Sequence, residues 1–300
     1  MDLVTVQIAL AAGQDILFAC AAGGFACGVM GKHSELFALD LLRLPCAAFT
    51  LGLVLTALAN LWLQASIMSG EPLGEAAPAV YAVLTKSHFG LAWSVGFTGA
   101  LLTALSCLHR GRQQVLFFAG IVLMAAGKAA ASHAADAGDF SWREAVHVAH
   151  LLATAFWAGS VMVAAILLRG CAHASGSSPE QCAEFCSVLS HLATSALVVV
   201  VITGGYNVMQ ETTHASMPLL AKLWGRLLAA KLSCVALATV LGGWNRMVVL
   251  PKLHMHAERH SPDYPVVQRR FNRALVAEAV VMLAVLTLAA VLGHTAPSTG

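Results

Sequence analysis

Charged side chains are scarce in this chain. Of its 300 residues only 11% are Asp, Glu, Lys or Arg, whereas 58% are hydrophobic. Globular proteins in water carry about 25% charged residues, so this scarcity excludes a water-soluble protein. The mean hydropathy of +0.76 indicates that lipid is the solvent for most of the chain. The net charge of +2 gives no indication of nucleic-acid binding, and no nucleic-acid partner is expected.

Signatures of nucleotide chemistry and of secretion are also missing. The sequence contains no P-loop and no phosphorylation motif, so ATP is not expected to drive an activity directly. The start of the chain, Met1-Asp2-Leu3, lacks the basic segment of a cleavable signal peptide. We therefore expect the first apolar run to be a retained helix.

Eight apolar runs are long enough to cross a bilayer, which takes about 20 residues for each helix. We therefore predict an all-α fold, a polytopic membrane protein in which residues 1–300 form a single integral membrane domain. The predicted spans are Thr5–Gly28, Pro45–Ile67, Val80–Leu108, Gln114–Ala131, Trp142–Leu168, Phe185–Met209, Leu223–Leu250 and Arg273–Leu292.

Basic residues are concentrated in the loops that follow the odd-numbered spans. By the positive-inside rule these loops face the cytoplasm, so both termini are predicted to face the periplasm. The basic residues concerned are Lys32, Arg43, Arg110, Arg112, Arg169, Lys252, Arg259, Arg269 and Arg270.

Histidines cluster where the fourth and fifth spans meet. His133 ends one predicted helix, and Glu144, His147 and His150 open the next at a spacing of three, which places them on one helical face. A short loop makes the two helices antiparallel neighbours, so His133 can approach that face. Three converging imidazoles predict a copper site, although zinc suits the same ligands. His88 and His294 are further candidates for this outer site.

A structural interpretation of these histidines stays open. A histidine at a helix end can cap carbonyl groups or lie in the headgroup layer without binding metal. Methionines at the outer face could add thioether ligands for Cu(I), but in so apolar a chain they are also expected as packing residues.

All eight cysteines fall outside the outer half of the predicted bundle. Cys171, Cys182 and Cys186 lie near the inner face, and Cys182 and Cys186 are four residues apart on one helical face. Thiols on the reducing side of a bacterial inner membrane are not expected to form structural disulfides. The pair could receive Cu(I), which prefers soft ligands, or could simply be apolar filler.

Ionisable residues inside the predicted spans are costly and indicate function by default. Asp15 and Lys128 are such residues, and together with Glu144 they are candidates for a polar ion path. Glu278 and Arg246 lie at compatible depths on successive helices, and we predict a structural pair for them.

The second half of the chain, from about residue 127 to 297, resembles the CopD family of copper resistance proteins, also found as PcoD. The first three spans resemble the family only in hydropathy. The motifs that carry the resemblance are Ser132-His133-Ala134, His150 with Trp157-Ala158-Gly159, Thr203-Gly204 with Asn207, Gly225-Arg226 with Lys231, Asn245-Arg246 with Leu250, and Glu278.

The resemblance implies a multi-pass inner-membrane protein for copper transport, homeostasis and resistance, which is not an enzyme. It implies copper, as Cu(I) or Cu(II), as the ligand, and a CopC-like periplasmic carrier as partner beside the lipid bilayer. It also implies that His133 and His150 are residues of the metal site. Departures are His147, at a position that is acidic in the family, and His294, which adds an imidazole near the end of the chain.

Two other functions remain as alternatives. A b-type haem protein that reduces Cu(II) or quinone would need axial histidines on facing helices at matched depth, and His88 with His150 is the candidate pair outside. A copper sensor would bind the ion without moving it across the membrane.

Overall fold

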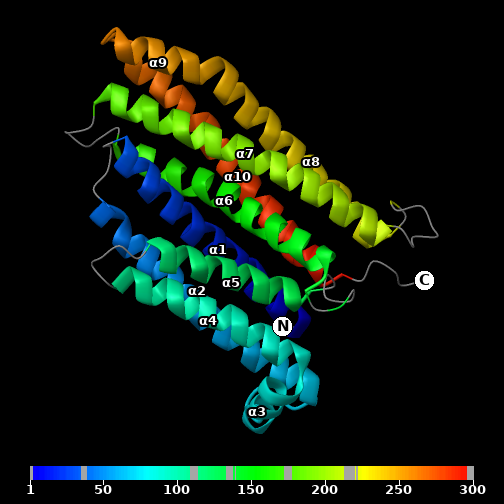
Figure 1. Ribbon diagram of the computed structural model, residues 1–300. Coiled ribbons are helices and arrows are strands. Elements are labelled where there is room, and N and C mark those ends of the chain that lie inside the picture. The colour runs from blue at the N-terminus through cyan, green and yellow to red at the C-terminus, as the bar shows by residue number, and fades with distance from the viewer. Residues whose placement is uncertain are drawn as a thin grey trace.

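The computed structural model describes residues 3–34, 39–108, 114–132, 138, 140–171, 178–212, 220 and 222–295. The described residues form an all-α bundle, as predicted (Figure 1). The helices are α1 (Leu3–His33), α2 (Leu39–Ser69), α3 (Ala77–Lys86), α4 (His88–Leu108), α5 (Gln114–Ala130), α6 (Trp142–Cys171), α7 (Pro179–Thr212), α8 (Leu223–Trp244), the π-helical turn η3 (Asn245–Val249), α9 (Leu250–Glu258) and α10 (Tyr264–Gly293).

Seven segments of the described chain are long and apolar enough to cross a membrane, which confirms a polytopic membrane protein. The remaining predicted span corresponds to α5, a shorter apolar helix of 17 residues. The orientation of the termini stays a prediction. The seven spans are Leu3–His33, Pro45–Ser69, His88–Cys107, Trp142–Arg169, Pro179–Gln210, Leu223–Glu258 and Tyr264–Gly293.

The third predicted span, Val80–Leu108, is divided into α3 and α4 at Ser87. Ser87 has an extended backbone conformation (φ −113°, ψ 148°), and its hydroxyl accepts the Gly90 N–H at 3.0 Å. A serine in this position caps the start of a helix. The residues of this segment have similar hydropathy, and hydropathy does not reveal a local hydrogen bond. The sequence alone therefore predicts one long span here.

The seventh predicted span continues to Glu258 through the π-helical turn η3. Pro251 is the second residue of α9, directly after this turn and Leu250, and has no N–H to donate to the preceding turn. The Leu250 N–H bonds to the Asn245 carbonyl five residues back. The wider turn therefore carries the helix past the proline. Within this turn Asn245 is buried and Arg246 bonds to α7.

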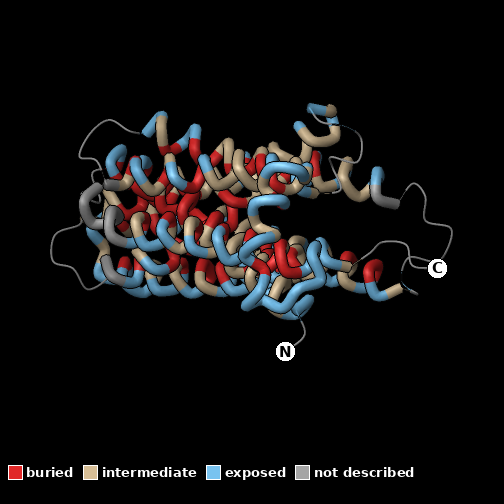
Figure 2. The backbone as a smooth tube through the Cα atoms, turned by 90° about the horizontal axis from the view of Figure 1, so that it is seen from below, coloured by how far each residue is buried: buried red, intermediate tan, exposed pale blue. Residues whose placement is uncertain are grey.

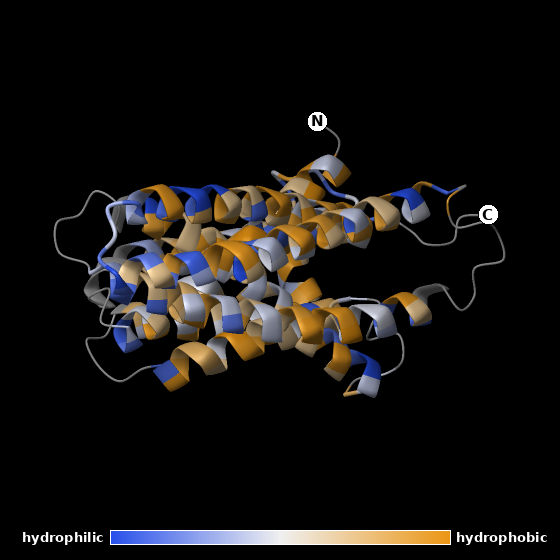
Figure 3. Cartoon of the chain, turned by 90° about the horizontal axis from the view of Figure 1, so that it is seen from above, coloured by the Kyte–Doolittle hydropathy of each residue, from blue (hydrophilic) through white to orange (hydrophobic). Residues whose placement is uncertain are grey.

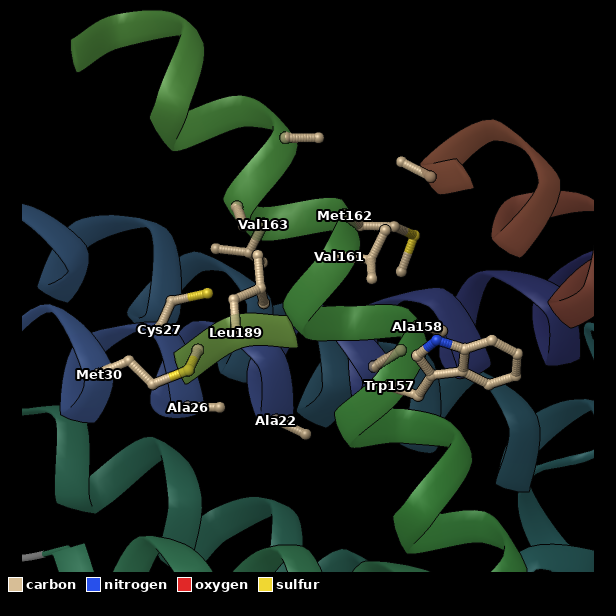
Figure 4. Packing of buried hydrophobic residues seen from close by; sticks show 14 of the residues in the cluster. Ala22, Ala26, Cys27, Met30, Trp157, Ala158, Val161, Met162, Val163 and Leu189 are labelled. Atoms are coloured by element: carbon tan, nitrogen blue, oxygen red, sulfur yellow. The ribbon is translucent and has the colours of Figure 1, made fainter. Parts of the chain in front are cut away.

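Helix α1 holds the two sides of the bundle together. Figure 1 shows α2, α4 and α5 on one side of it and α6 to α10 on the other. The closest approach is between α1 and α6, where a Cβ built on Gly23 would overlap the Gly159 backbone and one built on Gly159 would overlap the Ala19 carbonyl. Small residues let transmembrane helices approach this closely. Around the contact, Ala22, Ala26 and residues of α6 interlock (Figure 4).

The buried residues lie along the middle of the bundle, and its outer faces are exposed (Figure 2). Many of the exposed side chains are large and apolar, including Leu55, Ile166, Ile202 and Val240. Figure 3 shows hydrophobic residues along most of the helical surface. In a membrane these side chains would contact lipid rather than water.

Two matched substitutions on α1 test the central helix contact. Gly23→Ala is expected to destabilise the protein by about 1–3 kcal/mol because the added methyl group overpacks the contact with α6. Gly13→Ala meets no atom within 4 Å and is expected to be neutral or stabilising by up to about 1 kcal/mol. Thermal unfolding of both purified variants in detergent measures the difference, and equal melting temperatures would contradict the central role of this contact.

Candidate metal-binding site

Helix α6 begins with a side-chain cap that fixes the position of its first turns. The Ser141 hydroxyl accepts the Glu144 N–H at 3.2 Å, and the Glu144 carboxylate accepts the Phe140 N–H at 2.7 Å. This reciprocal arrangement is a variant of the capping box. The observed contacts of Glu144 are therefore those of a helix cap, and its part in an ion path stays a prediction.

His147 and His150 lie side by side on α6, one turn beyond this cap. Their ring centroids are 6.4 Å apart and the ring planes differ by 20°. Both imidazoles face α7, where they contact Thr203 and Asn207. The predicted common face is therefore observed for these two residues.

The hydrogen bonds of His150 determine which ring nitrogen is available to a metal. Its Nδ1 lies 2.9 Å from the Thr203 hydroxyl oxygen, and that hydroxyl donates its own proton to the Val199 carbonyl at 2.6 Å. As long as the one hydroxyl proton is used in the bond to Val199, Thr203 can only accept from Nδ1–H. Neutral His150 then has an unprotonated Nε2, the form that binds a metal ion.

His147 has the opposite arrangement. The Asn207 amide nitrogen lies 3.4 Å from Nδ1 of His147, and an amide nitrogen only donates. In this geometry Nδ1 accepts and Nε2 carries the proton. Rotation of the Asn207 amide would bring its oxygen to Nδ1 and free Nε2, so His147 can become a second ligand without any movement of the backbone.

Gly204 keeps α7 close to the His150 ring. A Cβ at this position would lie 3.1 Å from Cε1 of His150, closer than ordinary van der Waals contact. Three residues of α7 therefore contribute to this part of the site. Thr203 and Asn207 contact the histidines through hydrogen bonds, and Gly204 leaves room for the His150 ring because it has no side chain. The sequence resemblance includes these residues, but their pairing with particular histidines required the structure.

The other predicted outer ligands have different surroundings. His133 lies outside the described residues. His88 is exposed at the start of α4, which packs mainly against α2, α3 and α5, whereas α6 packs mainly against α1, α5, α7 and α10. His294 is exposed at the end of α10 and donates Nδ1–H to the Ala290 carbonyl at 2.8 Å, which leaves its Nε2 unprotonated in the neutral form. Within the described ranges, no three His, Cys, Asp or Glu side chains are close enough together to hold a metal ion.

Asp15 of α1 and Lys128 of α5 form an ion pair. Pairing lowers the cost of placing either charge in a membrane. The two residues singled out separately as intramembrane charges are thus brought together by the fold. Their contribution to an ion path stays a prediction.

Two of the predicted inner thiols are adjacent. Cys182 and Cys186 are buried and hydrogen-bonded to each other, and the Gln268 side chain of α10 donates to the Cys182 sulfur at 3.4 Å. Neither cysteine forms a disulfide bond within the described part of the chain. A pair of thiols in this arrangement could bind Cu(I) in a two-coordinate site. The side chain of Cys171, the third predicted inner thiol, lies outside the described residues.

The predicted pair of Arg246 and Glu278 is not observed as an ion pair. Arg246 donates to the Ser190 carbonyl at 2.9 Å and to the Thr194 hydroxyl at 2.6 Å, both on α7. A further contact at 3.4 Å joins it to Nδ1 of His191. The side chains of Arg246 and Glu278 nevertheless line the same cavity.

Two family models match the chain. The model described as Copper resistance protein D matches residues 183–292, and the one described as Copper resistance protein D-like, N-terminal domain matches residues 1–142. The second match covers spans for which the sequence showed a resemblance only in hydropathy. No curated protein and no solved structure matches the chain.

Removal of the Thr203 hydroxyl tests whether it prepares His150 for a metal. Thr203→Val is expected to weaken copper binding by about 10–100-fold, the usual effect of removing the hydrogen-bond partner of a ligating histidine. Thr287→Val is a matched control, since Thr287 makes the same bond to the carbonyl four residues back but is exposed on α10. Copper titration of both purified variants measures the affinities, and equal values would contradict the assigned role of Thr203.

Proposed function

Because the chain belongs to the CopD family of copper resistance proteins, we propose that it binds copper at its outer face and moves the ion across the inner membrane. The family is one of copper transporters with a role in copper resistance and uptake, and not an enzyme family. Its members are inner-membrane proteins, in agreement with the seven candidate spans.

The observation that carries the proposal is the hydrogen-bond chain at His150. The sequence from Nδ1–H through the Thr203 hydroxyl to the Val199 carbonyl leaves Nε2 as a lone-pair donor. His147 adjoins it and can supply a second imidazole. His133, which ends the preceding predicted helix, completes the proposed set, with His88 and His294 as further ligands. Imidazole is a suitable ligand for both copper oxidation states.

The inner end of the proposed route is the Cys182–Cys186 pair. Copper held by imidazoles outside would pass between the helices to these thiols, which prefer Cu(I). Asp15 and Lys128 would provide a polar step in the outer part of the path. A membrane potential negative inside favours import by about 2.3 kcal/mol per charge for each 100 mV, so we propose inward transport. A CopC-like periplasmic protein is the proposed source of the copper.

Replacement of the outer histidines tests the proposed entry site. His147→Ala with His150→Ala, and His133→Ala with His150→Ala, are each expected to lower copper affinity at least about tenfold and to reduce copper uptake into proteoliposomes. His254→Ala on α9 is the control and should retain both. Undiminished binding in the double variants would refute the site. Normal binding by the wild type without uptake would indicate a sensor rather than a transporter.

Replacement of the inner thiols tests whether they act in the release of copper rather than in its binding at the outer site. Cys182→Ser with Cys186→Ser is expected to leave copper binding at the outer histidines unchanged and to slow uptake at least about tenfold, because hard hydroxyls are poor ligands for Cu(I). Cys234→Ser, on α8, is the control. Uptake by the double variant at the wild-type rate would remove the thiols from the route.

A further inference from the structure

A cavity of about 370 Å³ lies between α7 and the segment formed by α8 and η3, with α6 and α10 as its other walls. It is set apart from the outer histidines along the bundle. Leu197 of α7 lines it, whereas Thr203 on the same helix contacts His150, and a separation of six residues along a helix corresponds to about 9 Å. Most of its lining is apolar, with Leu189, Leu197 and Phe271 among the side chains.

Glu278 is the buried acidic group of this cavity. Only 4% of the residue is exposed, and its carboxyl group is hydrogen-bonded to Trp157 of α6. In Figure 4 the Trp157 indole extends beyond Ala158, away from Cys27 and Met30 of α1. A Cβ on Gly242 would lie 2.9 Å from the Glu278 Oε1 atom, so the carboxyl group rests against the backbone of α8. No Lys, Arg or His of the described chain forms an ion pair with it.

Asn245 supplies a second acceptor to the same cavity. It is 4% exposed, and its Oδ1 atom is buried without a hydrogen-bond partner. A buried acceptor without a partner is unfavourable unless a water molecule or a ligand donates to it. The hydroxyls of Ser190 and Thr194 also line the cavity. A cavity of this size with several polar groups can hold water.

Apart from the Cys186 thiol, which belongs to the proposed inner copper site, the donor atoms of the cavity favour a proton over copper. They are the oxygens of Glu278, Asn245, Ser190 and Thr194, which a soft cuprous ion does not prefer. The titratable groups in the lining are Glu278, Cys186 of α7 and Arg246 of η3, and α6 and α8 contribute uncharged residues. Helix α1 also packs against α10, but its Asp15 is paired with Lys128.

We propose that Glu278 is a proton-exchanging group that couples copper transport to proton movement through this cavity. The protonated Glu278 carboxyl releases H⁺ to water in the cavity and becomes a carboxylate. The carboxylate takes up H⁺ from this water and becomes the carboxylic acid again. A copper cation in the bundle and a proton on Glu278 both add positive charge to one low-dielectric interior, so each disfavours the other. Copper entry therefore accompanies proton release in the opposite direction. This proposal rests on the proposed transport function.

The test measures copper and protons together. Wild-type proteoliposomes that contain a pH-sensitive dye are expected to show a rise in internal pH as copper enters. Glu278→Gln should lower this copper-linked signal at least tenfold, whereas Glu184→Gln, an exposed carboxylate on α7, should keep it. Gly242→Ala retains the carboxyl but displaces it, and should reduce the signal as well. Copper uptake without a pH change in the wild type, or with an equal change in Glu278→Gln, overturns the proposal.

A second measurement does not depend on transport. Infrared difference spectroscopy during a pH titration of the purified protein should show a carboxylic-acid carbonyl band that is lost in Glu278→Gln and shifted in Glu278→Asp. Persistence of this band in Glu278→Gln overturns the assignment. If the wild type takes up no copper, the transport function fails, and the infrared titration alone decides whether Glu278 exchanges protons.

Discussion

The rest of the structure depends on the contact between the backbones of α1 and α6. Gly23 and Gly159 let these helices meet with no side chain between them, and the surrounding alanines extend the contact along both helices. In lipid the hydrophobic effect does not draw apolar helices together, so close packing must provide the association. Helix α6 is thereby fixed at the centre of the bundle, and the functional side chains that it carries are fixed with it.

Helices α6 and α7 connect the two polar regions of the protein. Near the N-terminal end of α6, His147 and His150 contact Asn207 and Thr203 of α7. Further along α6, Trp157 lines the cavity that contains Glu278, together with Ser190 of α7. The same helix pair therefore carries the proposed outer copper ligands and lines the cavity that contains Glu278 of α10, the proposed proton-exchanging group. A shift of one helix along the other would affect both, which gives a structural basis for coupling between them.

Most of the polar groups inside the bundle have partners, as a lipid environment requires. Asp15 is paired with Lys128, and Arg246 is bonded to α7. The Oδ1 atom of Asn245 is among the few buried side-chain atoms of the described chain without a hydrogen-bond partner, together with Thr154 Oγ1 and Asn272 Oδ1, and the Glu278 carboxyl has no ion-pair partner there. Asn245 and Glu278 line one cavity. Their position beside a π-helical turn agrees with the frequent occurrence of such turns at functional sites.

The sequence by itself determined the membrane class, the approximate spans and the family. It also placed His147 beside His150 and Cys182 beside Cys186, because apolar length and helical period are properties of neighbouring residues. Only the tertiary structure decided that Thr203 contacts His150, that Arg246 contacts α7 rather than Glu278, and that Glu278 and Asn245 share a cavity. Each of these depends on which helices touch and at what register. The apolar faces of the helices have nearly equal hydropathy, so the sequence of one helix does not specify its neighbours. The choice of neighbouring helices depends on the close packing of the whole bundle.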